Sequence, residues 1–443
     1  MTQFQKFSIV PFLLLIGASV MALFSSDLNV EGLNDKGIVG ADVAWILVST
    51  AFVLLMTPGL AFFYGGMVSK KNVISTMLQS YISMAIITVL WIVVGFSLAF
   101  GEDVGGYGII GDPRTFFMMN NILADKPWSL APTIPLVLFA MFQMKFAIIT
   151  PALITGAFAE RIRFGSYILF ITLFILFIYA PICHATWHPD GILFKYGVLD
   201  FAGGTVVHMS AGWAALVAAI YLKSRHAENK IHNPARITYV LLGTGLLWFG
   251  WFGFNAGSAL GAGGLAALAL ATTTVAAAGA AITWILFDSV TGNKPSATGT
   301  SIGAVVGLVA ITPAAGFVSI PHALVIGVVA SIVSNLLIRV RTKTSIDDTL
   351  DVFACHGVGG MVGMILTGVF ANKAFNAVVV ENGLFYGESS LFIKHCITLV
   401  SVSVFFVIST YIVLKVTDLI SPLRVSEEDE MIGLDMSQHA EKL

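Results

Sequence analysis

Apolar residues dominate the chain in long runs that are separated by short polar loops. A helix needs about 20 apolar residues to cross a bilayer, so runs of this length predict membrane spans. The spans that we expect are 42–63, 73–99, 135–158, 165–185, 203–222, 237–257, 267–287, 298–315, 321–338, 352–371 and 393–414. The pattern therefore predicts an all-α polytopic membrane protein with eleven transmembrane helices.

Another apolar run, from Phe7 to Phe24, follows Lys6 and ends in small residues. This order is typical of a signal peptide. We therefore interpret residues 1–24 as a signal peptide, with an uncleaved extra N-terminal helix as the alternative. The membrane domain then covers residues 41–420. Residues 421–443 form a C-terminal tail, whose simplest interpretation is a solvated anionic segment.

Basic residues gather in every second loop, for example Lys70–Lys71, Arg161–Arg163 and Arg339–Lys343. Cytoplasmic loops of membrane proteins carry an excess of Lys and Arg. This distribution predicts a cytoplasmic C-terminus and, for the mature chain, an N-terminus outside the cell. An odd number of spans agrees with that orientation.

Composition supports a membrane protein and excludes several other classes. Only 11% of the residues are charged, against about 25% in a soluble domain. The net charge of −2 provides no net positive potential that would attract nucleic acid. The three cysteines, Cys183, Cys355 and Cys396, show no metal-ligand spacing. We expect no cofactor, no metal, because no set of three ligands is evident, and no enzymatic activity, because no nucleophile–base set is evident.

Two similar stretches place an aspartate and a histidine at the start of a span. In "DFAGGTVVHMSAG" Asp200 precedes His208 by eight positions, and in "DDTLDVFACHGVGGMVG" Asp348 precedes His356 by the same number. The two stretches open spans five apart, which enter the membrane from opposite sides. They predict two inverted five-helix repeats, followed by one C-terminal helix, with a site at the repeat interface.

Spacing indicates what the two pairs do. Eight residues of helix rise about 12 Å, so each aspartate would cap a helix at a membrane boundary while each histidine lies deeper. The two imidazoles, arriving from opposite faces, could then meet near the centre. The carboxylates of the expected spans lie at their ends. An apolar centre with two imidazoles suits a small neutral molecule or a proton better than a dehydrated cation.

Several long motifs resemble the Amt/Mep ammonium transporter family, from about Ala41 to the C-terminus. They are "DFAGGTVVHMSAG", "FGWFGFNAGSA", "FAIITPALITGAFAERIRF", "GAVVGLVAITPAAGFV" and "DVFACHGVGG". The resemblance implies a homotrimer in the lipid of a bacterial inner membrane, with one pore per subunit. It implies uptake of ammonium or methylammonium, with deprotonation at an outer cation site and passage of ammonia through a twin-histidine pore.

The resemblance also implies roles for particular residues. Phe146, Trp187 and Ser258 would bind the substrate cation, and Phe142, Phe146 and Phe254 would form the gate. His208 and His356 would line the pore, and Asp200 and Asp348 would be structural and electrostatic residues. A PII-type regulatory protein at the cytoplasmic face would be a further partner.

Some features leave alternatives open. Lys145 stands between the two phenylalanines of the mouth, where it either reaches the headgroups or faces the vestibule. His184 and His188 lie in "CHATWHPDG", and we interpret them as loop and helix-end histidines rather than metal ligands. The alternatives for function are an ammonium sensor that uses the same site, or a cation-coupled symporter for another small solute.

Overall fold

The computed structural model describes residues 3–24, 35–120, 122–123, 126–226 and 234–443, apart from the side chains of residues 3–7. Its helices, in chain order, are α1 (Gln3–Ala22), α2 (Gly40–Met67), η2 (Lys70–Asn72), α3 (Val73–Leu90), η3 (Trp91–Gly95), α4 (Phe96–Phe100), η4 (Phe117–Met119), α5 (Leu136–Phe158), α6 (Phe164–Phe174), η5 (Ile175–Tyr179), α7 (Ala180–Trp187), α8 (Ile192–Tyr196), η6 (Gly204–Met209), α9 (Ser210–Leu222), α11 (Ile237–Trp251), η7 (Phe252–Ala256), α12 (Gly264–Val290), α13 (Ala297–Ile311), α14 (Ile320–Arg341), η8 (Phe353–Val358), α15 (Gly359–Phe370), η9 (Leu384–Tyr386), α16 (Ser390–Ile420), α17 (Glu427–Ile432) and α18 (Leu434–His439).

The described part of the chain is helical, and its only β-type pairings are two isolated bridges. Ten of its helical segments are long and apolar enough to cross a membrane. Two shorter apolar helices accompany them, Ser8–Ala22 and α13. α13 falls on the eighth expected span and ends at Ile311, two residues before Pro313, which cannot donate a backbone hydrogen bond. The protein is therefore an all-α, multi-pass membrane protein.

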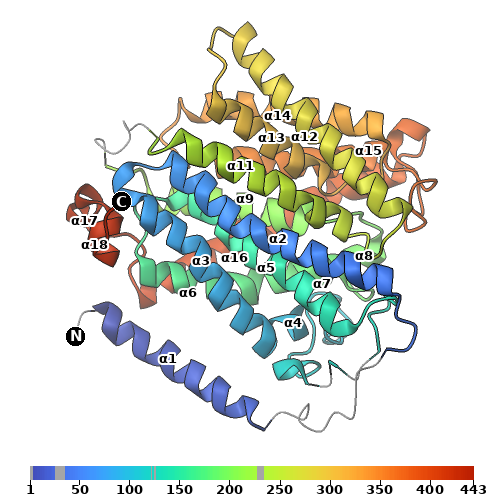
Figure 1. Ribbon diagram of the computed structural model, residues 1–443, viewed down its shortest axis with the longest axis horizontal. Helices are drawn as coiled ribbons and strands as arrows, with labels where there is room; N and C mark the ends of the chain where they lie inside the picture. The colour runs from blue at the N-terminus through green and yellow to red at the C-terminus, as the bar shows by residue number, and fades with distance from the viewer. Residues whose placement is uncertain (1–2, 25–34, 121, 124–125, 227–233) are drawn as a thin grey trace.

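The long helices lie side by side in one bundle (Figure 1). α2 packs along α11, and α5 is enclosed by α2, α3 and α9. Small residues allow close approach: a Cβ added to Gly243 of α11 would lie 2.6 Å from the Gly59 carbonyl oxygen of α2. Close packing through glycine is typical of helices in lipid, where burial of apolar surface alone does not drive association.

The bundle has two ends, which we name after residues that lie there. α7 and α8 lie at the Trp187 end, on the right in Figure 1, and α17 and α18 lie at the Glu160 end, on the left. α1, which covers most of the expected signal peptide, runs along the edge of the bundle and contacts α6.

Two helices that begin as π-helix cross each other, and we call them the broken helices: the first runs over η6 and α9, and the second over η8 and α15. η6 continues into α9 and η8 into α15, and each histidine of the repeated motif lies in the π-helical part. A Cβ added to Gly212 would lie 2.1 Å from the Gly357 nitrogen, so only glycine permits this crossing. The spacing of Asp200 and His208 predicted a continuous helix between them. This prediction was wrong, because the segment from Asp200 to Gly203 is not helical. The helix begins at Gly204, because the Asp200 carboxylate closes a turn before it.

Candidate functional site

A cavity of about 110 Å³ opens at the Trp187 end. Aromatic rings from several helices, a serine and the irregular segment around Asp200 line this cavity. The lining residues are Phe100, Trp128, Leu130, Phe139, Gln143, Thr186, Trp187, Phe194, Val198, Leu199, Asp200, Phe201, Ser258, Leu260, Phe317 and Val378. The Trp187 Nε1–H donates to the Asp200 carbonyl oxygen at 2.9 Å, which fixes the indole. The Ser258 hydroxyl donates to the Phe254 carbonyl at 2.9 Å. Its oxygen keeps acceptor capacity for a ligand.

Two polar residues of this cavity were missed by sequence reasoning. The Gln143 Oε1 and the Thr186 Oγ1 are buried without a hydrogen-bond partner. Buried polar groups are normally paired, so both are acceptors available to a bound donor. Trp128 and Phe139 were missed as well; their rings stack at 5.4 Å. Gln143 carried only a partial signal, since both Gln143 and Lys145 are polar residues between Phe142 and Phe146 in a mostly apolar span.

Phe142, Phe146 and Phe254 pack together next to the cavity. The Phe146 ring contacts Trp187 edge-on at 6.0 Å and Phe254 at 4.3 Å, and Phe142 contacts Phe146 at 5.0 Å. The structure thus brings the predicted gate residues together, but Phe146 and Phe254 are tilted by 42° rather than stacked. Phe146 does not line the cavity: it lies between Trp187, which does, and Phe254, which lines a second cavity.

The second cavity, of about 10 Å³, lies at the crossing of the two broken helices. His208 and His356 line it together with apolar side chains and Trp251. Their Nδ1 atoms lie 3.3 Å apart, which lets one imidazole donate to the other. The His208 Nε2 is buried without a partner, and the ring stacks on Trp251 at 5.3 Å. The ring nitrogens that do not bond the two histidines to each other can therefore hydrogen-bond to a small molecule in this otherwise apolar cavity.

Asp200 binds the start of the first broken helix. Its Oδ1 accepts hydrogen bonds from the Gly203 and Gly204 N–H groups, and its Oδ2 accepts from Thr205 and Val206. Burial raises the pKa of the Asp200 carboxyl above its ordinary value, and these four donors oppose the shift. The carboxylate satisfies N–H groups that the helix leaves free at its N-terminus.

Asp348 differs from Asp200 although the motif repeats. It accepts from the Phe353 N–H at 2.7 Å, while its Oδ1 is buried without a partner. Burial also raises the pKa of Asp348. The two aspartates thus begin equivalent helices, but the first is held by more backbone donors.

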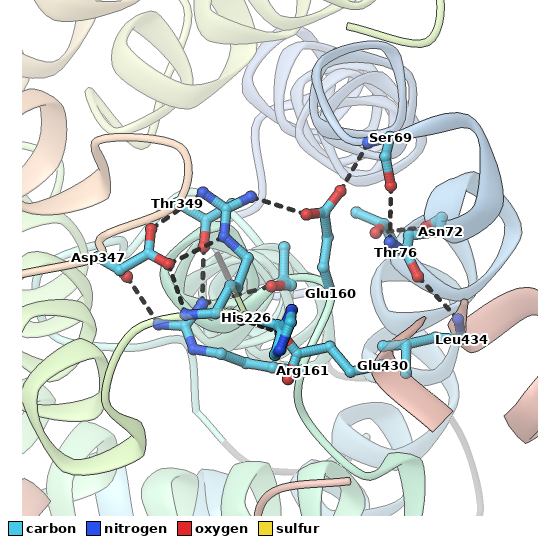
Figure 2. A network of polar contacts seen from close by, with 12 residues as sticks. Ser69, Asn72, Thr76, Glu160, Arg161, His226, Asp347, Thr349, Glu430 and Leu434 are labelled. Atoms are coloured by element: carbon cyan, nitrogen blue, oxygen red, sulfur yellow. Dashed lines mark hydrogen bonds and ion pairs between the residues drawn. The ribbon is translucent and has the colours of Figure 1, made fainter. Parts of the chain in front are cut away.

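A network of charged side chains occupies the Glu160 end (Figure 2). Arg225 donates to the Glu160 carboxylate at 2.7 Å and to Asp347 at 2.9 Å, and Arg161 donates to the Asp347 carbonyl at 2.6 Å. Burial alone would raise the pKa of Asp347, but the hydrogen bonds and charge of Arg225 lower it to about 2. The network connects the loop after α5 with the loops after α9 and α14.

The C-terminal tail is packed, which corrects the expectation of a solvated segment. Glu430 accepts from Arg424 at 2.7 Å and from the His226 N–H at 2.6 Å. The Asn72 Oδ1 accepts from the Leu434 N–H at 2.7 Å, as Figure 2 shows. Asp435 accepts from the N–H groups that open α3. The acidic residues are partners of a helix start and of a guanidinium, which composition does not reveal.

The structure also describes the three residues whose roles the sequence left open, His184, His188 and Lys145. His184 is buried between the Ala99 carbonyl and the Asp103 carboxylate, both at 3.1 Å, and stacks on His188 at 4.3 Å. No group of three or more His, Cys, Asp or Glu residues in the described ranges is arranged to hold a metal ion. Lys145 is half-buried and lines neither cavity.

These features define a multi-pass membrane protein with two small cavities in series, separated by phenyl rings. Residues 44–443 match the model of the Ammonium Transporter Family, and the chain belongs to that family. It is 45% identical over 402 residues to a putative ammonium transporter of Methanothermobacter thermautotrophicus, covering 90% of this chain and 97% of that protein. It is 43% identical to an ammonium transporter of Bacillus subtilis, covering 90% and 98%.

Solved structures show the same fold. The crystal structure of Saccharomyces cerevisiae Mep2 is similar, with a TM-score of 0.83, 35% identity and coverage of 89% of each chain. A Sensor Amt Protein is also similar, with a TM-score of 0.80, 29% identity and coverage of 90% of this chain and 98% of that chain.

Proposed function

We propose that this protein is an ammonium transporter that takes up ammonium and conducts it as ammonia. The observation that carries the proposal is the order in which three different environments follow one another along the bundle. An aromatic cavity with free oxygen acceptors is followed by phenyl rings, and these are followed by an apolar cavity with two imidazoles. Each environment suits one stage of the passage of a small cation that is converted to a neutral molecule.

The first cavity suits recruitment of the ion. Aromatic faces attract a cation by about 0.5–2 kcal/mol, and tryptophan does so most strongly. Trp187 supplies such a face, while the oxygens of Gln143, Thr186 and Ser258 can accept N–H hydrogen bonds from ammonium. Methylammonium has fewer N–H groups but the same charge, and it serves as a second substrate.

The next steps separate the ion from its proton. Phe142, Phe146 and Phe254 form the gate and exclude water, and an apolar passage penalises the charged form over the neutral one. Ammonia then crosses along His208 and His356, whose ring nitrogens donate to it and accept from it. A cation-coupled symporter is less well supported, because the buried carboxylates Asp200 and Asp348 lie at helix starts and not at the histidine cavity.

The topology that we propose has eleven spans, consisting of ten long segments and α13. Residues 41–420 would hold two inverted five-helix repeats followed by α16, after a signal peptide at residues 1–24. The Glu160 end, with its many basic loops, would be cytoplasmic with the tail at residues 421–443. The Trp187 end would face outside. A homotrimer in a bacterial inner membrane, with a PII-type regulatory protein at the Glu160 end, completes the proposal.

One measurement separates transport from sensing. The purified protein is reconstituted in liposomes on a solid support, and an ammonium pulse is applied while current and internal pH are recorded. We expect the internal pH to change faster than in empty liposomes, and a current if the proton follows the ammonia. A chain that binds ammonium without either signal would be a sensor, as the similarity to a Sensor Amt Protein allows.

A further inference from the structure

His395 is a buried histidine that belongs to neither cavity. It lies near the start of α16, and none of its surface is exposed. Its Nε2 accepts a hydrogen bond from the Leu199 backbone N–H at 3.1 Å, and its Nδ1 lies 2.7 Å from the Met364 carbonyl oxygen of α15. The ring therefore connects two helices with the irregular segment that precedes η6.

The partners determine which nitrogen carries the proton. A backbone N–H can only donate, so the Nε2 that faces Leu199 has no hydrogen. A carbonyl oxygen can only accept, so Nδ1 carries the hydrogen and donates to Met364. This arrangement uses both ring nitrogens of a neutral imidazole. A Cβ added to Gly368 would lie 3.2 Å from the His395 Cβ, so the packing leaves the side chain little room to move.

The residue that His395 holds is adjacent to the substrate cavity. Leu199 lines the first cavity, and the next residue, Asp200, accepts the Trp187 indole N–H through its carbonyl. The Asp200 carboxylate caps the helix that carries His208. A shift of the Leu199 backbone would therefore reach the tryptophan through one intervening residue.

The surrounding backbone does not form a regular element that could hold Leu199 without help. Gly197 and Gly203, with φ of 87° and 114°, stand on either side of the segment in conformations that other residues rarely adopt. Val198 donates to Leu193 and Phe201 donates to Pro313, so the neighbours are held from other directions. Between these two anchors, a side chain from α16 holds Leu199.

We propose that His395 is a positioning residue of the substrate cavity, which sets the backbone of Leu199 and Asp200 and, through it, the Trp187 indole. The inference rests on the proposed function. It assigns to α16, the helix outside the proposed repeats, a part in substrate affinity. His395 acts through hydrogen bonds in one neutral form, and it touches neither substrate nor pore.

Substitutions that differ in hydrogen bonding test this role. His395→Leu removes both bonds and leaves the buried Leu199 N–H without its partner. His395→Gln keeps them, because its amide offers one acceptor oxygen and two donor hydrogens at similar reach. His322→Leu is the matched control: this histidine lies near the start of α14, packs on Phe370 at 4.4 Å and lines neither cavity.

The measurement is methylammonium uptake into liposomes as a function of concentration, with the amount of folded protein determined by size-exclusion chromatography. We expect His395→Leu to raise KM by roughly three- to tenfold, with a much smaller change in maximal rate. His395→Gln should return KM to within about twofold of the wild-type value, and His322→Leu should leave it unchanged.

Other outcomes overturn the inference. An unchanged KM in His395→Leu would show that the bond to Leu199 does not set affinity. Equal loss of maximal rate and folded protein in both His395 variants, with KM retained in what remains, would make the residue a structural tether only. A His395→Gln variant as impaired in KM as His395→Leu would contradict the hydrogen-bond mechanism. A wild-type protein without uptake would overturn the proposed function itself.

Discussion

The Nδ1 atoms of His208 and His356 lie 3.3 Å apart, although 148 positions separate the two residues in the chain. Each comes from a helix whose first turns are π-helix, a geometry that is often found at functional sites. The two helices cross at Gly212 and Gly357, so the rings meet only because the backbones touch. This contact supports our view that the two motifs work as one unit.

The first prediction concerns this pair. Changing His208 or His356 to Ala should lower methylammonium flux by roughly tenfold or more, because the neutral molecule loses a polar partner in an apolar cavity. Uptake into liposomes measures the effect, and His322→Ala serves as the control. Unchanged flux in both variants would contradict a pore role for the imidazoles.

The second prediction concerns the aromatic face of the cavity at the Trp187 end. The half-saturating concentration for methylammonium should increase in the order wild type, Trp187→Phe, Trp187→Leu. The leucine variant should differ from wild type by about two- to thirtyfold, which corresponds to loss of a cation–π contact. The maximal rate should change less. A concentration dependence that is identical in all three proteins would exclude Trp187 from recruitment.

The third prediction concerns the crossing of the broken helices. In Gly212→Ala the new Cβ would lie 2.1 Å from the Gly357 nitrogen, so the helices must separate. We expect a loss of stability of about 1–3 kcal/mol or more, seen as a lower midpoint of thermal denaturation in detergent. Gly245→Ala is the matched control, since nothing lies within 4 Å of its added Cβ. Equal midpoints for the two variants would mean that the crossing tolerates the methyl group.

The fourth prediction concerns the charged network at the Glu160 end. The pKa of Asp347 is about 2 in the folded protein, below the ordinary 3.8, because the bonds from Arg225 outweigh the effect of burial. A lowered pKa stabilises the folded state at neutral pH, and this contribution is lost as the pH falls from about 4 to about 2. Asp347→Asn should therefore show a shallower loss of stability in that window. Parallel curves of denaturation midpoint against pH would refute the assignment.

Much of the architecture follows from the sequence for a physical reason. In lipid each span must satisfy its own backbone hydrogen bonds, so length and hydropathy suffice to predict helices. The repeated Asp–His spacing also predicted that two distant histidines belong together. The expected spans 165–185 and 203–222 agree within two residues with the helices that begin at Phe164 and end at Trp187 and that run over Gly204–Leu222. The expected span 298–315 was less accurate, because α13 ends at Ile311.

Only the tertiary structure decided which side chains face the cavity at the Trp187 end. α5 is buried on nearly all sides, so its apolar pattern carries no information about which face points to the cavity. Gln143 therefore could not be assigned to the cavity from periodicity. The same holds for Thr186, because α7 is also buried along almost all of its length. His395 contacts Leu199 across 196 positions, and no local signal links them. The sequence determined that helices cross the membrane and that two imidazoles pair, because hydropathy and repeats are properties of the chain; packing between distant helices decided the cavity and its supports.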